Sequence, residues 1–210
     1  MVEGQLRRRG IEDERVLAAM ATVPREAFVP AEIRRRAYAD AALPIDAGQT
    51  ISQPWIVAAI CEALALRGSE TVLEVGGGSG YSAAVLAQLA ARVISIERLP
   101  QLATTARAAL AELGIGADRV EVVVGDGSLG YPAGAPFEAI AVHAAAPAQP
   151  RTLLLQLAPG GRLVAPIGEG GGEALVAFVQ DVADADLFRR RRIAACRFVP
   201  LLGAEGYAER

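Results

Sequence analysis

A glycine-rich segment directly after a predicted buried strand is the part of this sequence most able to do chemistry. It reads VLEVGGGSG over residues 72–80, and a helical pattern follows it. Glycines at such a place let the backbone turn tightly and approach a bound ligand closely. The dinucleotide fingerprint G-x-G-x-x-G would need its third glycine at position 81, which is Tyr81. This spacing argues against an NAD-dependent dehydrogenase.

The spacing that is present, G-x-G-x-G after an acidic residue, resembles the first motif of S-adenosylmethionine-dependent methyltransferases. Its candidate cofactor-binding residues are Glu74, Gly76, Gly77, Gly78 and Gly80. S-adenosylmethionine has no pyrophosphate and carries a cationic sulfonium and an ammonium group. An acidic residue in the strand therefore suits it better than a bare helix N-terminus, which favours anions.

Two further acidic positions follow the next two predicted strands. Glu97 ends the second strand, where a carboxylate can accept both ribose hydroxyls. Asp126 and Gly127 follow the third strand, where a side chain or backbone group can reach an adenine edge. Each acidic residue alone could simply cap a loop. Three of them at successive strand ends, together with the glycine loop, predict one cofactor site.

The elements that must position these residues alternate between strands and helices. Continuous apolar strands are predicted at residues 71–76, 92–97, 119–125, 137–143 and 162–168, and helices at 80–91, 100–113 and 150–158. Such alternation is typical of an α/β fold with a parallel sheet covered on both faces. Two last strands, at 173–180 and 193–201, lack a helix between them and are expected to form an antiparallel hairpin at one edge. The predicted fold is a Rossmann-like S-adenosylmethionine-dependent methyltransferase fold.

The first 55 residues are predicted to form an irregular helical extension. Asp13 is expected to cap one helix, which ends before Pro24. The basic runs Arg34–Arg36 and Arg189–Arg192 are interpreted as a solvated helix face and as an exposed hairpin turn or sheet edge.

Composition excludes several classes of chemistry. The 210 residues include one histidine, His143, and no lysine, so Schiff-base chemistry is impossible and a Ser-His-Asp hydrolase would need His143. Cysteine and histidine are too few for a disulfide scaffold or a zinc site, so no metal is expected. The net charge of −3 offers no basic field for nucleic acid or an acidic membrane. No membrane span or signal peptide is visible. Cys61 and Cys196 are expected to be free thiols, so a reducing cytoplasm is the expected compartment.

Nearly the whole chain resembles the protein-L-isoaspartate (D-aspartate) O-methyltransferase family. The matching segments include QLRRRGIEDERVLAAMATVPREAFVP (5–30), AYADAALPIDAGQTISQPWIVA (37–58), VLEVGGGSGYSAAVLA (72–87), GDGSLGYPAGAPFEAI (125–140), LLLQLAPGGRLVAPIG (153–168) and RFVPLLG (197–203). The GQTISQP segment is far more specific than the glycine motif. The resemblance implies one methyltransferase domain over 1–210, with the extension and active-site loop at 1–55 and the cofactor-binding core at 56–210.

The resemblance also implies roles for individual residues. Ser52 matches the active-site hydroxyl, and Gln49, Thr50 and Ile51 match the loop that covers cofactor and substrate. The substrate peptide is expected along the C-terminal strand, which places Phe198 and Val199 as substrate-binding residues. The implied cofactor is S-adenosyl-L-methionine, and the implied partners are isoaspartyl-containing peptides and proteins. No nucleic acid or membrane partner is expected, and the enzyme is expected to be a monomer.

Several positions depart from the pattern of the family, and Gly77 and His143 bear most on the site. Gly77 stands where threonine, serine or cysteine is common, and His143 stands where a small residue is usual. We weigh three roles for His143: a structural or cleft-lining residue, a substrate contact, or an acid/base group.

The implied reaction moves a methyl group from the sulfonium to a free carboxylate. That carboxylate is already ionised at neutral pH, so no general base is required. Ser52 is then a positioning hydrogen-bond donor. It could equally cap a helix that runs to about residue 66.

Other functions remain open from the sequence. The nearest is a carboxyl methyltransferase of the same fold that acts on a normal aspartate of a dedicated peptide or on a small acid. A cofactor-binding module without transfer activity and a nucleic-acid methyltransferase are further alternatives, and the acidic balance disfavours the latter.

Overall fold

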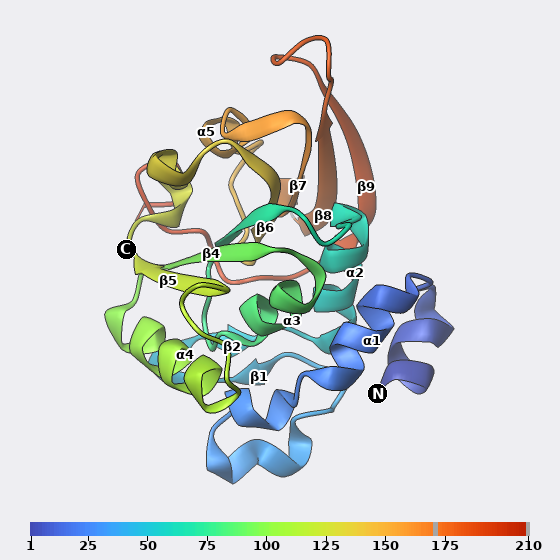
Figure 1. The fold of residues 1–210 in the computed structure, drawn as a ribbon, viewed down its shortest axis with the longest axis vertical. Helices are drawn as coiled ribbons and strands as arrows, with labels where there is room; N and C mark the ends of the chain where they lie inside the picture. Colours follow the sequence, from blue (N-terminus) through green and yellow to red (C-terminus); the bar gives the residue numbers. More distant parts are fainter. Residues whose placement is uncertain (170–171, 209–210) are drawn as a thin grey trace.

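A seven-stranded sheet organises the chain in the computed structural model, which describes residues 1–169 and 172–208 (Figure 1). Its strand order is β5-β4-β3-β6-β7-β8-β9. The strands are β3 (Thr71–Val75), β4 (Arg92–Glu97), β5 (Val120–Val124), β6 (Phe137–Val142), β7 (Leu157–Glu169), β8 (Gly172–Gln180) and β9 (Phe188–Cys196). The strands from β3 to β7 pair in parallel, whereas β8 and β9 are antiparallel to their neighbours. This confirms the mostly parallel sheet with an antiparallel hairpin at one edge.

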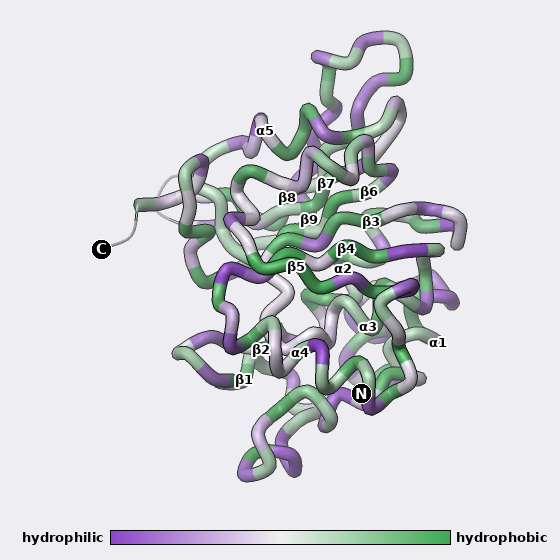
Figure 2. The backbone as a smooth tube through the Cα atoms, turned by 60° about the vertical axis from the view of Figure 1, so that its left-hand side comes forward, coloured by the Kyte–Doolittle hydropathy of each residue, from purple (hydrophilic) through white to green (hydrophobic). Residues whose placement is uncertain are grey.

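Most of the helical mass covers one face of this sheet. The α-helices are α1 (Glu14–Thr22), α2 (Pro54–Leu64), α3 (Tyr81–Leu89), α4 (Pro100–Glu112) and α5 (Arg151–Leu154). The first four bury apolar side chains in one core cluster with one set of strand residues, such as Val72 and Val93. Alternate strand residues, such as Leu73 and Ile94, form a second cluster with α5 on the other face. Figure 2 shows the hydrophobic strands running through the middle of the molecule.

The N-terminal segment is irregular and helical, as predicted. It contains short helical turns at Val2–Leu6, Arg7–Arg9, Arg25–Phe28 and Ala31–Arg36. Asp13 caps α1, because its side chain accepts hydrogen bonds from the backbone N–H groups of Arg15 and Val16. A two-stranded hairpin, β1 (Leu43–Pro44) and β2 (Thr50–Ile51), follows, and its turn includes Asp46–Gly48.

Two predicted elements were wrong. The helix expected at 150–158 is only α5, because β7 begins at Leu157 and passes through the Pro-Gly-Gly sequence with a register shift against β6. The last strand, expected at 193–201, is β9, which begins and ends earlier. The arginines at 189–192 lie within this edge strand and are exposed, which confirms the edge interpretation. The segment after Cys196 leaves the sheet instead of extending it.

The boundary expected at residue 55 lies inside α2, so the extension and the core share this helix. No helix of the residues described here is long and apolar enough to cross a membrane.

Candidate active site

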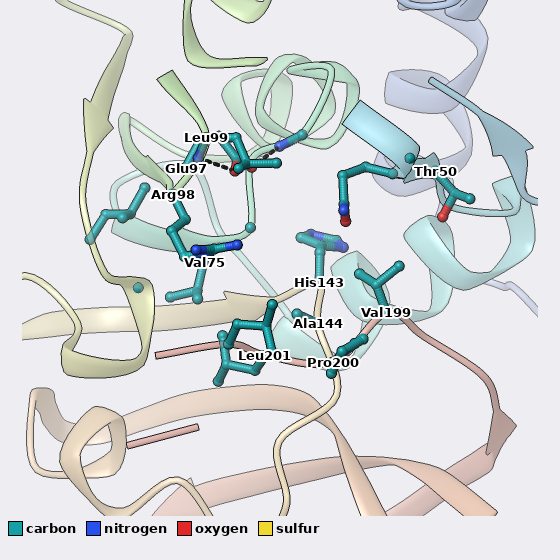
Figure 3. A pocket seen from close by; sticks show the side chains of 17 residues that line it. Thr50, Val75, Glu97, Arg98, Leu99, His143, Ala144, Val199, Pro200 and Leu201 are labelled. Atoms are coloured by element: carbon teal, nitrogen blue, oxygen red, sulfur yellow. Dashed lines mark hydrogen bonds between the residues drawn. The ribbon is translucent and has the colours of Figure 1, made fainter. Parts of the chain in front are cut away.

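A cavity of about 280 Å³ opens where the carboxyl ends of the parallel strands meet (Figure 3). The sheet order changes direction between β3 and β6, and open α/β sheets bind ligands at such a point. The residues that line the cavity come from the segments after β3, β4, β5 and β6, from the β1–β2 hairpin, and from the C-terminal segment. They are Gly48, Gln49, Thr50, Val75, Gly76, Gly78, Ile96, Glu97, Arg98, Leu99, Gly127, His143, Ala144, Val199, Pro200, Leu201 and Leu202.

The glycine loop forms one wall of this cavity. Gly76 and Gly78 have positive φ angles of 85° and 54°, which favour glycine. The N–H groups of Gly76 and Gly77 donate to the carbonyl of Ile96, and that of Gly78 donates to the Glu97 carboxylate. These three donors are therefore engaged within the protein. This loop is not arranged as a phosphate cradle, which agrees with the failed dinucleotide fingerprint.

Glu97 places a carboxylate at the cavity wall. Its Oε1 accepts from the N–H of Leu99 and its Oε2 from the N–H of Gly78, both at 2.8 Å. Each oxygen keeps a further lone pair, because a carboxylate oxygen can accept two hydrogen bonds. The two backbone contacts fix the side chain, so it can accept two vicinal hydroxyl groups of a ligand.

Glu74 lies beneath the glycine loop rather than at the cavity surface. Its side chain is fully buried and lines neither this cavity nor its smaller neighbour. Oε2 accepts a 2.5 Å hydrogen bond from the Ser95 hydroxyl, and Oε1 has no hydrogen-bond partner in the described part of the chain. Burial raises the pKa of Glu74 to about 7. The sequence identified this carboxylate, but not that other groups separate it from a ligand.

His143 follows β6 and stands between Glu74 and the cavity. Its Nε2 lies 2.7 Å from the Ser82 hydroxyl and 3.6 Å from Glu74 Oε1. Burial lowers the pKa of His143 to about 4, so the imidazole is neutral at physiological pH. Ser82 and Ser95 complete this buried polar cluster. Neither could be predicted from the sequence, because each lies within an apolar stretch.

A second cavity of about 40 Å³ adjoins the first. Thr50, Ile51 and Ser52 line it together with the glycine loop, and His143 lines both cavities. The β1–β2 hairpin therefore brings Ser52 beside the glycine loop. Residue Gln53, not Ser52, is the N-cap of α2, and no side chain caps that helix. The capping interpretation of Ser52 was wrong.

The third acidic position is used structurally. Asp126 accepts hydrogen bonds from the N–H and hydroxyl of Ser128 and from the N–H of Ala204, and it does not line the cavity. Gly127 does line it, and a Cβ there would lie 2.6 Å from Val75 Cγ1. Gly80 directly precedes α3 and lies outside both cavities, where it packs against Ala106 of α4.

The C-terminal segment closes the cavity from below in Figure 3. Ala145 holds this segment by two backbone hydrogen bonds. Its N–H donates to the carbonyl of Val199, and its carbonyl accepts from the N–H of Leu201. Val199 therefore lines the cavity, whereas Phe198 packs against the core and donates its N–H to Glu173. Neither residue belongs to a C-terminal strand, which corrects that expectation.

Comparison with known proteins identifies the family. Residues 1–206 match the family model described as protein-L-isoaspartate(D-aspartate) O-methyltransferase. The chain belongs to this family. It is 54% identical over 209 residues to protein-L-isoaspartate O-methyltransferase 1 of Rhodopseudomonas palustris (strain HaA2), covering 99% of this chain and 84% of that protein. It is 52% identical over 207 residues to the protein-L-isoaspartate O-methyltransferase of Methanoculleus marisnigri, covering 99% and 92%.

Two solved structures share the fold. A protein-L-isoaspartate O-methyltransferase superposes with a TM-score of 0.85 at 28% identity, over 98% of this chain and 67% of that one. A β-aspartate methyltransferase structure from Plasmodium falciparum, in complex with S-adenosyl-L-homocysteine, gives a TM-score of 0.79 at 26% identity over 96% of both chains. These likenesses confirm the predicted fold class.

In this chain, the Ser95 hydroxyl already fills the space into which a side chain at residue 77 would extend. A Cβ at residue 77 would lie 2.3 Å from the Ser95 hydroxyl oxygen and 3.5 Å from Glu74 Oε2. The Ser95 hydroxyl of strand β4 therefore occupies the space that a side chain at residue 77 would need. The φ angle of Gly77 is not positive, so its backbone conformation alone would accept another residue. The contact with Ser95 is therefore what favours glycine here.

Gly77→Ala is expected to lower the free energy of unfolding by about 1–3 kcal/mol, because the new methyl group overpacks Ser95. In a Ser95→Ala background the same substitution should cost less than about half as much, because the clashing oxygen is gone. Urea unfolding of the four variants measures this coupling. An equal cost in both backgrounds would show that the Ser95 contact is not the reason for the glycine.

Proposed function

We propose that the larger cavity binds S-adenosylmethionine and that the Ser52 cavity receives the carboxylate to be methylated. Members of this family are S-adenosylmethionine-dependent methyltransferases that act on L-isoaspartyl residues of damaged proteins, and this chain is one of them. The observation that carries the residue assignment is the shared wall at His143. It joins the glycine-loop cavity to the cavity lined by Ser52, so a donor and an acceptor of a methyl group can meet there.

The residues present fit the cofactor. Glu97 offers a fixed carboxylate to the ribose hydroxyls, and Gly76, Gly78 and Gly127 leave backbone exposed to a closely packed ligand. Gln49 and Thr50 cover the opposite side from the β1–β2 hairpin. S-adenosylmethionine supplies the activated methyl group, and the protein supplies position and electrostatics.

Methyl transfer here needs no protein base. The carboxylate oxygen forms the new bond to the methyl carbon while the carbon–sulfur bond breaks, and a neutral methyl ester and S-adenosylhomocysteine result. Opposite charges disappear in this step, so a site that excludes water favours it. The role left to the chain is to align oxygen, carbon and sulfur, which can lower a barrier by up to about 7–11 kcal/mol. Ser52 serves this alignment as a hydrogen-bond donor to the carboxylate.

Methyl incorporation into one peptide in its isoaspartyl and its normal aspartyl form tests the substrate. We expect turnover on the isoaspartyl form and little on its aspartyl control. Preference for the aspartyl form, or for a small acid, would favour the alternative carboxyl methyltransferase.

Ser52→Ala is expected to lower kcat on the isoaspartyl peptide by about 10–100-fold, the loss of one hydrogen bond to a charged group. S-adenosylhomocysteine affinity should stay within about threefold. Thr104→Ala, on the exposed side of α4, is the matched control and should leave both quantities unchanged. Unchanged turnover in Ser52→Ala would remove the positioning role.

The remaining assignments are also proposals. We infer that the enzyme acts as a monomer in the cytoplasm, on isoaspartyl and D-aspartyl proteins and not on nucleic acid. The net charge of −3 supports the exclusion of nucleic acid as a substrate.

A further inference from the structure

We propose that His143 is a further cofactor-binding residue, whose Nδ1 accepts a hydrogen bond from the α-ammonium group of S-adenosylmethionine. This inference rests on the proposed function and assigns one more residue to it. It starts from the only imidazole of the chain, which lines both cavities and which the methyl-transfer chemistry leaves without a role.

The surroundings of Nε2 determine which ring nitrogen carries the proton. Nε2 lies 2.7 Å from the Ser82 hydroxyl oxygen and 3.6 Å from Glu74 Oε1, a buried carboxylate oxygen with no hydrogen-bond partner in the described part of the chain. When Glu74 is ionised, its Oε1 and the Ser82 hydroxyl oxygen are two acceptors on this side, and they favour a proton on Nε2. Nδ1 then carries a lone pair. Because both contacts engage Nε2, Nδ1 is the ring nitrogen that a ligand can reach.

A lone pair on the cavity wall selects the charge of its partner. It repels a carboxylate and accepts from an N–H donor, and it binds a cationic donor best. The substrate carboxylate is therefore a poor partner for Nδ1, whereas an ammonium group is a good one. Burial keeps the imidazole neutral, since it holds the pKa of His143 near 4. The buried Glu74 behind the ring adds negative potential whenever it is ionised.

The position of His143 along the cavity decides which part of the cofactor it meets. Figure 3 shows Glu97, Arg98 and Leu99 at one end of the cavity, Thr50 at the other, and the His143 ring between them. If Glu97 holds the ribose, the adenosine half occupies its end. The amino-acid half must then extend past Gly76 toward His143 and Thr50. In this arrangement the negative charge of Glu74 acts on the cationic cofactor through the His143 imidazole, without direct contact.

Two amide substitutions separate the two ring nitrogens. His143→Asn keeps an acceptor near the position of Nδ1 and loses the contact with Ser82. His143→Gln keeps a donor near the position of Nε2 and loses the acceptor at Nδ1. Two ligands complete the design: S-adenosylhomocysteine carries the α-ammonium group, and 5′-methylthioadenosine lacks the whole amino-acid half.

Isothermal titration calorimetry on the full chain is the test. We expect His143→Gln to weaken S-adenosylhomocysteine at least about tenfold and His143→Asn to weaken it less than about threefold. Affinity for 5′-methylthioadenosine should be unchanged in both variants, which also shows that the adenosine part of the site is folded. The KM for the isoaspartyl peptide should not change.

Three outcomes would overturn the proposal. They are equal losses for both ligands, an unchanged affinity for S-adenosylhomocysteine in His143→Gln, and a raised peptide KM with unchanged cofactor affinity, which would make His143 a substrate contact. The first two outcomes are binding measurements and do not depend on turnover, whereas the third requires an enzyme that methylates the peptide. Failure of the wild-type enzyme to methylate isoaspartyl peptide would instead overturn the proposed function.

Discussion

Replacing Arg25 by methionine is expected to lower the free energy of unfolding by about 2–4 kcal/mol and to reduce methyl transfer more than tenfold in the fraction that remains folded. The Arg25 side chain is fully buried. Its Nε donates to the carbonyl of Ala37 and its Nη2 to the carbonyl of Ser52, each at 2.7 Å. The guanidinium also lies 4.8 Å from the centre of the Tyr81 ring. One side chain therefore ties Ser52, at the end of the active-site loop, to α3.

The sign of this effect depends on two opposing contributions. Burial opposes the charge, as the lowered pKa of Arg25 shows, and its Nη1 has no hydrogen-bond partner in the described part of the chain. An apolar side chain removes that cost. It also leaves the buried carbonyl of Ala37 and the partly buried carbonyl of Ser52 without donors, at about 1–3 kcal/mol each, and loses a cation–π contact of about 2 kcal/mol. The losses exceed the gain, and the Ser52 backbone is one of the groups released.

Urea unfolding and peptide turnover, measured on the same preparations, check this expectation. Arg25→Lys should behave nearly as badly, because one ammonium cannot reach both carbonyls and stack on the ring. The matched control is Arg92→Met, which breaks a surface ion pair with Glu121 and should cost less than about 1 kcal/mol. A stable and active Arg25→Met enzyme would show that the desolvation of the guanidinium cancels all three contacts.

Strand ends were the part of the site that the sequence could predict. Gly76, Glu97 and Gly127 were found because buried parallel strands are recognisable in the sequence as apolar runs, and the carboxyl ends of these strands meet at one edge of the sheet. Arg98 and Leu99 directly follow such an end, so the same rule could have found them as lining residues. The parallel sheet and its antiparallel edge followed from the same pattern.

The sequence did not allow us to predict how deeply each site residue is buried or where the chain runs after the last strand. Strand periodicity indicated that Glu74 lies in β3, but its separation from the cavity depends on Ser95 of β4 and His143 of β6, which are distant in sequence. The start of β9 was missed because its exposed arginines interrupt the apolar pattern on which the prediction relied, and its end was placed too late because apolar residues continue after Cys196. Ser52 lies at the site through the hairpin register rather than through a helix cap, and register depends on tertiary pairing.

Glu74→Gln and a His143 variant are expected to change the pH dependence of stability in opposite directions. Burial lowers the pKa of His143 from 6.5 to about 4 and raises the pKa of Glu74 from 4.5 to about 7. Between pH 4.5 and 6.5 the unfolded chain carries one proton on the pair, on the histidine, and the folded chain carries one, on the glutamate. Since the proton counts are equal, the wild-type pair contributes almost no slope in this range.

Each single substitution exposes the slope of the other group. In Glu74→Gln only His143 remains, and its contribution is present above pH 6.5 and lost as the pH falls toward its folded pKa of about 4. In His143→Asn only Glu74 remains, and its contribution is present below pH 4.5 and lost as the pH rises through its folded pKa of about 7. Each change is on the order of 3 kcal/mol, which follows from the difference between the ordinary and the folded pKa of the group.

Urea unfolding from pH 4.5 to 7, expressed as the difference from wild type at each pH, removes the common background of the exposed carboxylates. The double variant Glu74→Gln/His143→Asn should regain the flat profile, because neither group remains. If instead the pair were an ion pair in the folded protein, both folded pKa values would lie on the other side of their ordinary values. Either single substitution would, however, leave the other group buried without a counter-charge, so each single variant reports the desolvation of the remaining group alone. A single variant with the opposite slope would contradict the burial-driven pKa shift of that group.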